Sequence, residues 1–433
     1  MKTALEAETN DITLEIATDS HKTDMSVPSA KLRFLTFISL LSATFGVSCL
    51  GLSAMAAQVG IMMYVLLLIL SAIINYYSYI CFIELTKKYK ISSFSQLSEL
   101  IFGRAKFLVD FVFFICNTGI QISNMILLRR LVGNLLIELG FNNDFTVNMK
   151  NPVMFMVLMF LIFPLMVKKK LKDLFLINLF TLLAVLYITV FIVTVFIKGG
   201  TEIKVRTNSP LILYSIPQIP EAYAYIFYTF MCQNNFISIY NEYGLENSGS
   251  LKRILKAHLG LIFFAYTLIG LSGYFIFYQH PLIKTATIMS LFTSKNLYIF
   301  VANFLMAFTS LIAFVFTFNP CKVMIMYYIN KITGRESQAE KEENVVGIDK
   351  LNAFTTVVLA FFVLLFCICF TKWDVGYIEI LGMLADFICP FLFVIGPIGF
   401  YFTKSGDFRF LMVFVVACFL YFWSVSRHFK HLI

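Results

Sequence analysis

Charged residues are scarce in this sequence: they make up 14% of the 433 residues, whereas hydrophobic residues make up 59%. An average soluble domain is roughly a quarter charged. The polar residues are not spread periodically but gather between apolar runs of about twenty residues, the length that crosses a bilayer core as a helix. A soluble fold is therefore excluded, and the sequence predicts an integral membrane protein.

Motifs for catalysis are also missing. The sequence contains no His-Glu-x-x-His pattern, no nucleophile elbow and no paired acids within an apolar run. None of its five histidines falls in the middle of a predicted span. We therefore expect no enzyme, no metal and no cofactor other than a coupling ion. An ion channel is disfavoured because the sequence has no repeated filter-like segment and no ring-forming charge cluster.

External disulfides are not expected, because the nine cysteines lie in or at the edges of apolar runs. The net charge of +9 does not indicate nucleic-acid binding, because the basic residues form short clusters between predicted spans. Most of the 34 basic residues fall on one set of alternating loops, including the clusters at 87–90, 168–172 and 252–256. The positive-inside rule therefore predicts a cytosolic amino terminus.

The apolar runs predict an all-α membrane protein with eleven transmembrane helices. They cover residues 33–56, 60–83, 107–128, 152–167, 174–197, 221–241, 256–277, 297–319, 351–370, 377–402 and 408–425. Residues 1–32 are predicted to form a cytosolic disordered tail, residues 33–402 the core, residues 408–425 an additional helix and residues 426–433 an outside tail. Within the core, residues 33–197 and 221–402 would be two five-helix repeats.

Span one is predicted to break in its middle, because the stretch Gly46 to Ser53 is rich in small and flexible residues. A break would free backbone amides at the start of the outer half-helix, where the positive end of the helix dipole can hold a carboxylate. The alternative is helix packing through small residues. The substrate-binding candidates of this span are Gly46, Ser48, Cys49, Leu50, Gly51 and Ser53.

Span six carries three consecutive amides, Gln233, Asn234 and Asn235, near its middle. Such residues are costly in hydrocarbon unless they face a cavity or a partner. They could satisfy loosened backbone and accept a substrate ammonium group, and Phe230 beside them could shape a side-chain pocket. Spans one and six cross the membrane in opposite senses, and paired interruptions of this kind indicate a transporter site between inverted repeats.

These residues resemble the amino acid/auxin permease family. The stretch Gly46 to Met55 is similar to its first-helix motif, and its Gly-Leu-Ser ending is closest to the neutral amino acid transporter branch, which includes sodium-coupled members. The stretch Phe230 to Asn235 resembles the sixth helix of that branch, where a His usually stands at the position of Gln233. Further similarities follow in family order, at residues 95–97, 102–103, 270–274, 319–322 and 397–401.

The resemblance implies a LeuT-like fold of two inverted five-helix repeats plus one extra helix, with the substrate held between helices one and six. Sodium-coupled members tend to have an Asn near what is here Ser42 and a Thr near what is here Ala313. The family's second glycine is Ser48 here. Nearby oxygens come from Thr44, Thr309 and Ser310, so these three residues and Ser42 are ion-coupling candidates. The coupling ion, proton or sodium, stays undecided.

Asp386 lies about ten residues into span ten, where the family usually has a small residue. An acid near the midplane is costly when ionised and could serve as a proton-coupling site. The alternative is a packed polar contact with Asn117, Asn124 or Asn303.

Two functions remain open from the sequence. The first is a secondary active transporter, a symporter, of amino acids, most simply neutral ones because no acid accompanies either break. The second is an amino acid sensor that signals through its amino-terminal tail to a cytosolic partner. Both bind an amino acid within a lipid membrane, and either the plasma membrane or a vacuole-like or lysosome-like membrane is compatible with the sequence.

Overall fold

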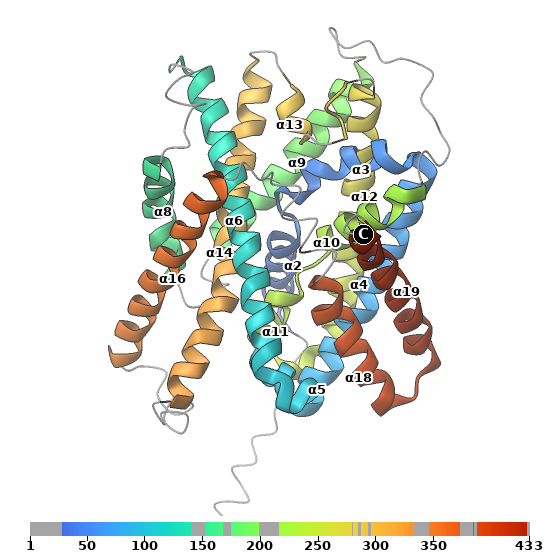
Figure 1. Cartoon of the computed structure of the whole chain (residues 1–433), viewed down its shortest axis with the longest axis vertical. Helices are drawn as coiled ribbons and strands as arrows, with labels where there is room; N and C mark the ends of the chain where they lie inside the picture. The colour runs from blue at the N-terminus through green and yellow to red at the C-terminus, as the bar shows by residue number, and fades with distance from the viewer. Residues whose placement is uncertain are drawn as a thin grey trace, which may run out of the picture.

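The structure is a computed structural model that describes residues 28–140, 152–167, 175–198, 216–278, 280–284, 287–292, 296–332, 346–372, 384 and 388–430. These residues fold into a bundle of helices that run mostly along one direction (Figure 1), and no strand occurs among them. The predicted tail, residues 1–27, and Asp386 lie outside the described residues.

The first half of the described chain contains nine helical elements. They are α2 (Ala30–Thr44), η1 (Val47–Gly51), α3 (Leu52–Val59), α4 (Ile61–Tyr89), α5 (Phe94–Phe102), η2 (Gly103–Ala105), α6 (Lys106–Glu138), α8 (Pro152–Met166) and α9 (Phe175–Ile197).

The second half begins with η4 (Ile216–Gln218), α10 (Ile219–Thr229) and α11 (Gln233–Tyr243). It continues with η5 (Leu245–Asn247), α12 (Ser248–Phe277), α13 (Ile288–Leu291), α14 (Leu297–Ile332), α16 (Val346–Lys372), the π-helical turn η6 (Phe391–Ile395), α18 (Gly396–Ser405) and α19 (Phe408–Lys430).

Six helices among the described residues are long and apolar enough to cross a membrane, or seven if the bent pair α2 and η1–α3 is one span. This confirms a multi-pass membrane protein. The count of eleven stays a prediction, because much of the tenth predicted span lies outside the described residues. The outer helices turn large apolar side chains outward, including Phe160, Phe361 and Phe419, each more than 60% exposed. We expect these side chains to contact lipid.

Several helices are longer than the apolar runs that predicted them. The longest, α14, has 36 residues, which corresponds to about 54 Å at 1.5 Å per residue. The hydrocarbon core is only about 30 Å thick, so such a helix extends well beyond it. In the same way α12 begins at Ser248, eight residues before the predicted start of span seven. The apolar runs therefore located the hydrocarbon-crossing parts and missed the helical ends.

The predicted ends of the chain's core also shift by a few residues. Ser29 caps the first helix by accepting a hydrogen bond from the Leu32 amide at 3.2 Å, so α2 begins at Ala30 instead of residue 33. At the other end α19 continues to Lys430, five residues past the predicted limit of span eleven. Residues 28–32 and 426–430 therefore belong to or adjoin helices and not to the predicted tails.

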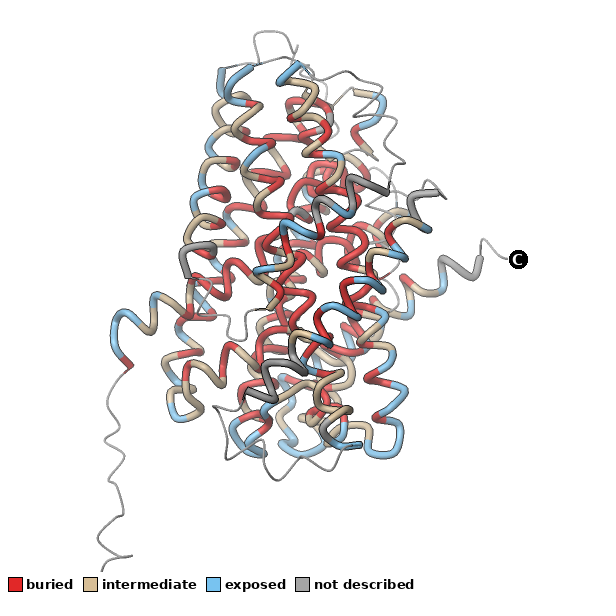
Figure 2. Tube along the Cα trace, turned by 90° about the vertical axis from the view of Figure 1, so that its left-hand side faces the viewer, coloured by how far each residue is buried: buried red, intermediate tan, exposed pale blue. Residues whose placement is uncertain are grey.

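The centre of the bundle is formed by α2, α10, α11 and α12, with α4 beside them and α6 and α14 packed together on the other side (Figure 1). Buried residues fill the interior of the trace, whereas exposed residues concentrate at both ends and on the outer faces (Figure 2). The two short half-helices α10 and α11 are buried along most of their lengths. The interrupted elements therefore lie in the interior and not at the lipid surface.

One end of the bundle is held together by a cluster of charged and hydroxyl side chains from α5, α6 and α14. The Asp110 carboxylate accepts hydrogen bonds from the Ser98 hydroxyl at 2.5 Å and from the Tyr328 hydroxyl at 2.6 Å. Lys106 forms an ion pair with Glu99 at 2.5 Å and donates to the Tyr327 hydroxyl at 2.8 Å. These contacts fix the short helix α5 against the long pair α6 and α14.

The turn between α3 and α4 depends on a glycine. Gly60 has φ 82° and ψ 161°, a conformation that is essentially restricted to glycine, and it ends one helix and begins the next. This turn determines how the first span connects to the second.

We expect Gly60→Ala to destabilise the protein by about 1 to 3 kcal/mol, the cost of placing a Cβ in that backbone region. The measurement is the thermal unfolding midpoint of the purified protein in detergent. Gly260→Ala is the matched control, because Gly260 is helical and exposed on α12 and its added Cβ would meet nothing within 4 Å. Equal midpoints for the two variants would show that the turn tolerates a side chain.

Candidate functional site

The first span breaks close to the position that the sequence predicted. α2 ends at Thr44, Phe45 makes the last helical hydrogen bond to the Leu41 carbonyl at 2.7 Å, and Gly46 is extended at φ −105° and ψ −172°. The chain then re-enters a helix through η1, and the two parts of the span meet at an angle of 48°. The small residues therefore interrupt the helix and do not only allow close packing.

The sixth span is interrupted as well. α10 ends at Thr229, residues 230–232 are not helical, and α11 begins at Gln233. The Phe230 and Met231 amides bond to carbonyls three residues earlier, at 3.2 and 3.0 Å, which tightens the chain before it leaves the helix. The amide triplet therefore stands at the start of the second half-helix and not inside the gap.

Three buried tyrosines hydrogen-bond to the backbone of these breaks. The Tyr79 hydroxyl donates to the Phe230 carbonyl and accepts from the Cys232 amide, both at 2.8 Å. The Tyr225 hydroxyl donates to the Ser48 carbonyl at 2.9 Å. Because backbone groups without partners are costly in an apolar interior, these hydroxyls stabilise the interrupted conformation.

The third tyrosine, Tyr266 on α12, lies between the two breaks. Its hydroxyl is 2.9 Å from the Thr229 carbonyl and 3.4 Å from the Thr44 carbonyl. Thr44 is the last residue of α2 and Thr229 is the last residue of α10. The carboxyl ends of both half-helices therefore converge on one phenolic oxygen.

A cavity lies where the two breaks meet, and it leaves about 50 Å³ of space for the centre of a water-sized molecule. The cavity is lined by residues from α2 and its break, α6, α10–α11, α14 and η6: Ala43, Thr44, Gly46, Ser48, Ile120, Asn124, Tyr228, Met231, Asn234, Asn235, Ala313, Phe316, Thr317 and Phe393. None of these side chains is charged.

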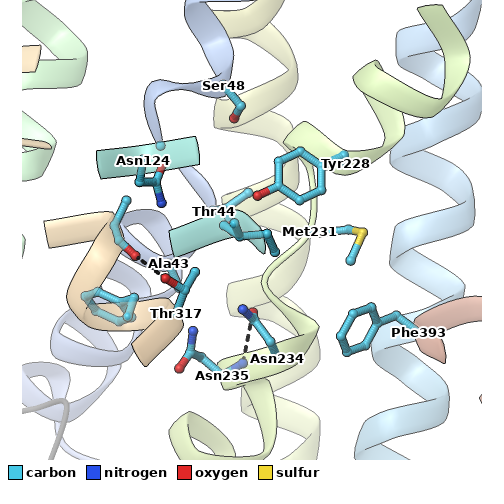
Figure 3. Close-up of a pocket in the computed structure, with 14 residues that line it drawn as sticks. Ala43, Thr44, Ser48, Asn124, Tyr228, Met231, Asn234, Asn235, Thr317 and Phe393 are labelled. Atoms are coloured by element: carbon cyan, nitrogen blue, oxygen red, sulfur yellow. Dashed lines mark hydrogen bonds between the residues drawn. The ribbon is translucent and has the colours of Figure 1, made fainter. Parts of the chain in front are cut away.

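The close-up view shows how the lining divides (Figure 3). Tyr228, Met231 and Phe393 lie on one side, and Asn124, Thr317 and Asn235 lie on the other. Thr44 and Ser48 border the space between them. The cavity therefore has an aromatic and thioether wall opposite a wall of amides and hydroxyls.

Four of the ten predicted substrate-binding residues line this cavity: Gly46, Ser48, Asn234 and Asn235. Asn234 donates to the Asn117 side chain at 3.1 Å, and its oxygen accepts from the Asn235 amide at 3.1 Å. The Asn235 side-chain oxygen is buried and has no hydrogen-bond partner among the described residues. An unpaired acceptor beside a cavity is available to a ligand that donates hydrogen bonds.

The other six predicted residues do not line the cavity. Cys49, Leu50 and Phe230 are buried in the core, and the Phe230 ring packs edge-on against Tyr266 at 5.3 Å between centroids. A Cβ at Gly51 would overlap the Tyr225 hydroxyl, so Gly51 permits the contact between Tyr225 and the break. Ser53 donates to the Ile269 carbonyl at 3.3 Å.

Gln233 points away from its two amide neighbours. Its amide nitrogen donates to the Asn75 oxygen at 2.8 Å and lies 3.3 Å from the Ser78 hydroxyl, both on α4. Asn75 in turn donates to the Phe227 carbonyl at 3.3 Å, near the end of α10. Gln233 therefore contributes to holding the break, whereas Asn234 and Asn235 face the cavity.

The ion-coupling candidates donate to carbonyls on four different stretches of chain. Ser42 donates to the Asn178 carbonyl at 3.2 Å, Thr44 to Leu40 at 3.0 Å, Thr309 to Leu305 at 2.8 Å and Ser310 to Asn124 at 3.0 Å. Of the four, Thr44 lines the cavity. The fifth candidate, Asp386, lies outside the described residues. Asn117, one of its predicted partners, accepts a hydrogen bond from Asn234 at 3.1 Å.

Sequence reasoning did not select several residues of the site. Ile120, Asn124, Ala313, Phe316, Thr317 and Phe393 line the cavity from helices α6 and α14 and from η6. The order of the helices along the chain does not predict which face of α6 or of α14 turns toward the cavity. His258 was also missed, because it lies near the start of an apolar run although it is well inside the helix α12.

We expect Tyr79→Phe to destabilise the protein by about 1 to 3 kcal/mol for each buried backbone group left without a partner. Both the Phe230 carbonyl and the Cys232 amide lose the hydroxyl in this variant. The thermal midpoint in detergent measures the effect, and Tyr89→Phe, at an exposed residue of α4, is the control. A midpoint unchanged from wild type would mean that water replaces the hydroxyl.

The overall arrangement is similar to that of one solved transporter in particular. It is similar to a Na⁺-coupled sialic acid symporter in a substrate-bound, outward-open state, with a TM-score of 0.55 at 13% identity, covering 95% of this chain and 92% of that chain. A manganese transporter of Eremococcus coleocola in complex with an aromatic bis-isothiourea substituted compound gives a TM-score of 0.43 at 12% identity, with 94% and 98% covered. No curated protein matches the chain.

The fold is similar to that of the Na⁺-coupled sialic acid symporter, and two interrupted helices border a cavity. The family described as "Transmembrane amino acid transporter protein" matches residues 34–426. The chain therefore belongs to this amino acid transporter family, as the resemblance of its first and sixth spans to the amino acid/auxin permeases predicted.

Proposed function

We propose that this protein is a secondary active transporter of neutral amino acids that works by alternating access. The single observation that carries the proposal is the uncharged cavity at the meeting point of two interrupted helices. A zwitterion has no net charge but needs strong hydrogen-bonding groups at both ends. A cavity without a charged side chain, next to helix ends with partial charges, suits such a substrate better than a cation or an anion.

The two charged groups of an amino acid would bind to different parts of the breaks. The ammonium group would donate to the buried Asn235 oxygen and to carbonyl oxygens at the carboxyl ends of α2 and α10. The carboxylate would accept from amides where the first span re-enters a helix, after Gly46. Helix ends of both signs therefore border one cavity, which is the arrangement that a zwitterion requires.

The side chain of the substrate would lie between the remaining walls. Tyr228, Met231 and Phe393 form an apolar surface, and Asn124 and Thr317 form a polar one. This lining supports small and medium neutral side chains and offers no counter-charge to a cationic one. The resemblance to the neutral amino acid transporter branch points to the same substrate class.

Alternating access would use the breaks as hinges. A half-helix can change its angle at an interrupted segment without breaking the hydrogen bonds inside the helix, and inverted-repeat transporters rock around a central site in this way. A cytosolic amino terminus and a plasma or vacuole-like membrane stay predictions of the sequence. The sensor alternative depends on residues 1–27, which lie outside the described residues.

Uptake of labelled neutral amino acids into proteoliposomes tests the function. We expect uptake by the wild-type protein and its loss in Gly51→Leu, because a side chain at Gly51 would displace Tyr225 from the broken span. Gly260→Leu, at an exposed helical glycine, is the matched control and should transport like wild type. Equal uptake by all three proteins would refute the site, and no uptake by wild type would refute the transporter.

Asn235 tests the ammonium contact. Losing a hydrogen bond to a charged group costs about 1.5 to 3 kcal/mol, so Asn235→Leu should raise the half-saturating concentration about 10- to 100-fold. Asn235→Asp is the control, because it keeps an acceptor oxygen in the same place and should retain most of the apparent affinity. If Asn235→Leu saturates at the wild-type concentration, the ammonium group binds elsewhere.

A further inference from the structure

One titratable side chain lies directly behind the cavity wall. His258 on α12 is fully buried, and its Nε2 is 3.1 Å from the Thr44 hydroxyl. Thr44 lines the cavity, so a single hydroxyl separates the imidazole from the proposed substrate site. The other ring nitrogen, Nδ1, is buried without a hydrogen-bond partner among the described residues.

The hydrogen bond from Thr44 to Leu40 favours one tautomer of His258. A threonine hydroxyl has one hydrogen, and the Thr44 hydroxyl donates it to the Leu40 carbonyl at 3.0 Å. The contact with Nε2 is then satisfied when Nε2 donates to the Thr44 oxygen. This arrangement leaves Nδ1 as a bare acceptor, a nitrogen that can take up one proton.

Two features of the surroundings act on the charge of the imidazole in opposite directions. Thr44 is the last residue of α2, and the partial negative charge at a helix carboxyl end stabilises a nearby positive charge. The Thr44 and Thr229 carbonyls, at two such ends, meet at Tyr266, two turns after His258 on the same helix. Burial acts in the opposite direction, because it disfavours the charged imidazole.

No acid forms a hydrogen bond or an ion pair with His258 among the described residues. The titratable and charged groups on α12 and on the elements in contact with it or with Thr44 include Lys31, Arg33, Cys49, Tyr64, Tyr76, Tyr79, Glu84, Tyr187, Cys232, Glu246, Lys252, Lys256 and Tyr266. Glu84 is ion-paired with Lys252 at 2.5 Å, and Glu246 accepts from Asn247 at 3.1 Å. Within the described part of the chain, the imidazole therefore has no fixed counter-charge.

We propose that His258 carries the proton that is transported together with the amino acid. This inference rests on the proposed function and selects the proton as the coupling ion. His258 takes up one proton at Nδ1 while the cavity is open to one side of the membrane, and the imidazole becomes an imidazolium. Nε2 continues to donate to Thr44, and the same proton leaves Nδ1 after the cavity opens to the other side. No bond other than this N–H bond forms or breaks.

The position of Thr44 links the proton to the substrate. Thr44 ends the half-helix α2, so a change in the angle of α2 at the break moves the hydroxyl that holds the imidazole. A zwitterion adds no net charge, so each cycle carries one positive elementary charge across the membrane. Uptake should therefore be stimulated by a more acidic solution on the substrate side and should generate a current.

The test compares exchange with net transport in proteoliposomes that contain a pH-sensitive dye and labelled neutral amino acids. In the wild-type protein, addition of amino acid should acidify the lumen, and a proton gradient should drive accumulation. In His258→Gln, whose amide can still donate to Thr44, exchange of internal for external amino acid should persist, whereas acidification and gradient-driven accumulation should be lost. His280→Gln is the control, because this histidine lies outside the helices and should behave like wild type.

The outcomes separate this inference from the proposed function. Exchange by the wild-type protein without acidification, or acidification that persists in His258→Gln, would overturn the proton role and leave the transporter function intact. Absence of exchange in the wild-type protein would refute the transporter function itself. If His258→Gln does not fold, the variants Thr44→Ser and Thr44→Val replace it. We expect fewer protons transported per amino acid in Thr44→Val, which lacks the hydroxyl, than in Thr44→Ser, which keeps it. Equal ratios in these two variants would overturn the proposal.

Discussion

The structure depends on how backbone groups find partners where two helices are interrupted inside a membrane protein. A helix that spans hydrocarbon normally satisfies its own amides and carbonyls, and an interruption leaves several of them without a helical partner. Here tyrosine hydroxyls supply much of the replacement, because a phenol combines a large apolar ring with one group that can both donate and accept. Tyr79, Tyr225 and Tyr266 are fully buried and direct their hydroxyls at the breaks.

The same requirement explains the small residues of the first span. Gly51 has no side chain, so the Tyr225 ring can approach the break and reach the Ser48 carbonyl. Gly46 adopts the extended conformation that separates α2 from η1. Small residues therefore have two separate tasks in one short stretch, namely to end a helix and to admit the side chain that stabilises the ending. Neither task requires these residues to touch a substrate, and of the two glycines Gly46 lines the cavity.

The sequence was sufficient to predict the membrane class, most of the spans, the two breaks and the family. Composition and run length determine the membrane class and the spans, because hydrophobic burial in a bilayer depends on residue type and length and not on fine packing. The breaks and the family followed from local motifs, namely the small residues of the first span and the amide triplet of the sixth. The sequence could not determine which amide of the triplet faces the cavity. Successive residues of a helix point about 100° apart, so Gln233 turns toward α4 while Asn234 and Asn235 turn toward α6 and α14.

His258 shows a second limit of reasoning from apolar runs. The run that marked span seven starts at residue 256, which placed this histidine at a membrane edge, but α12 starts at Ser248 and carries it into the interior. The first turns of a long helix can be amphipathic, and an average hydropathy over a window of residues does not detect them. They can nevertheless pack inside the bundle. A buried contact between residues that are 214 positions apart, such as the one between His258 and Thr44, has no signature in a single sequence.

The convergence of two helix ends on Tyr266 has a mechanical consequence. One phenolic oxygen contacts the carbonyl of the last residue of α2 and that of the last residue of α10. The two half-helices therefore have a common contact point on a third, uninterrupted helix, α12. A tilt of either half-helix would change the hydrogen bonds of this oxygen. The position of one half-helix is therefore coupled to that of the other through Tyr266. In such a bundle, α2 and α10 would change their tilt together around Tyr266.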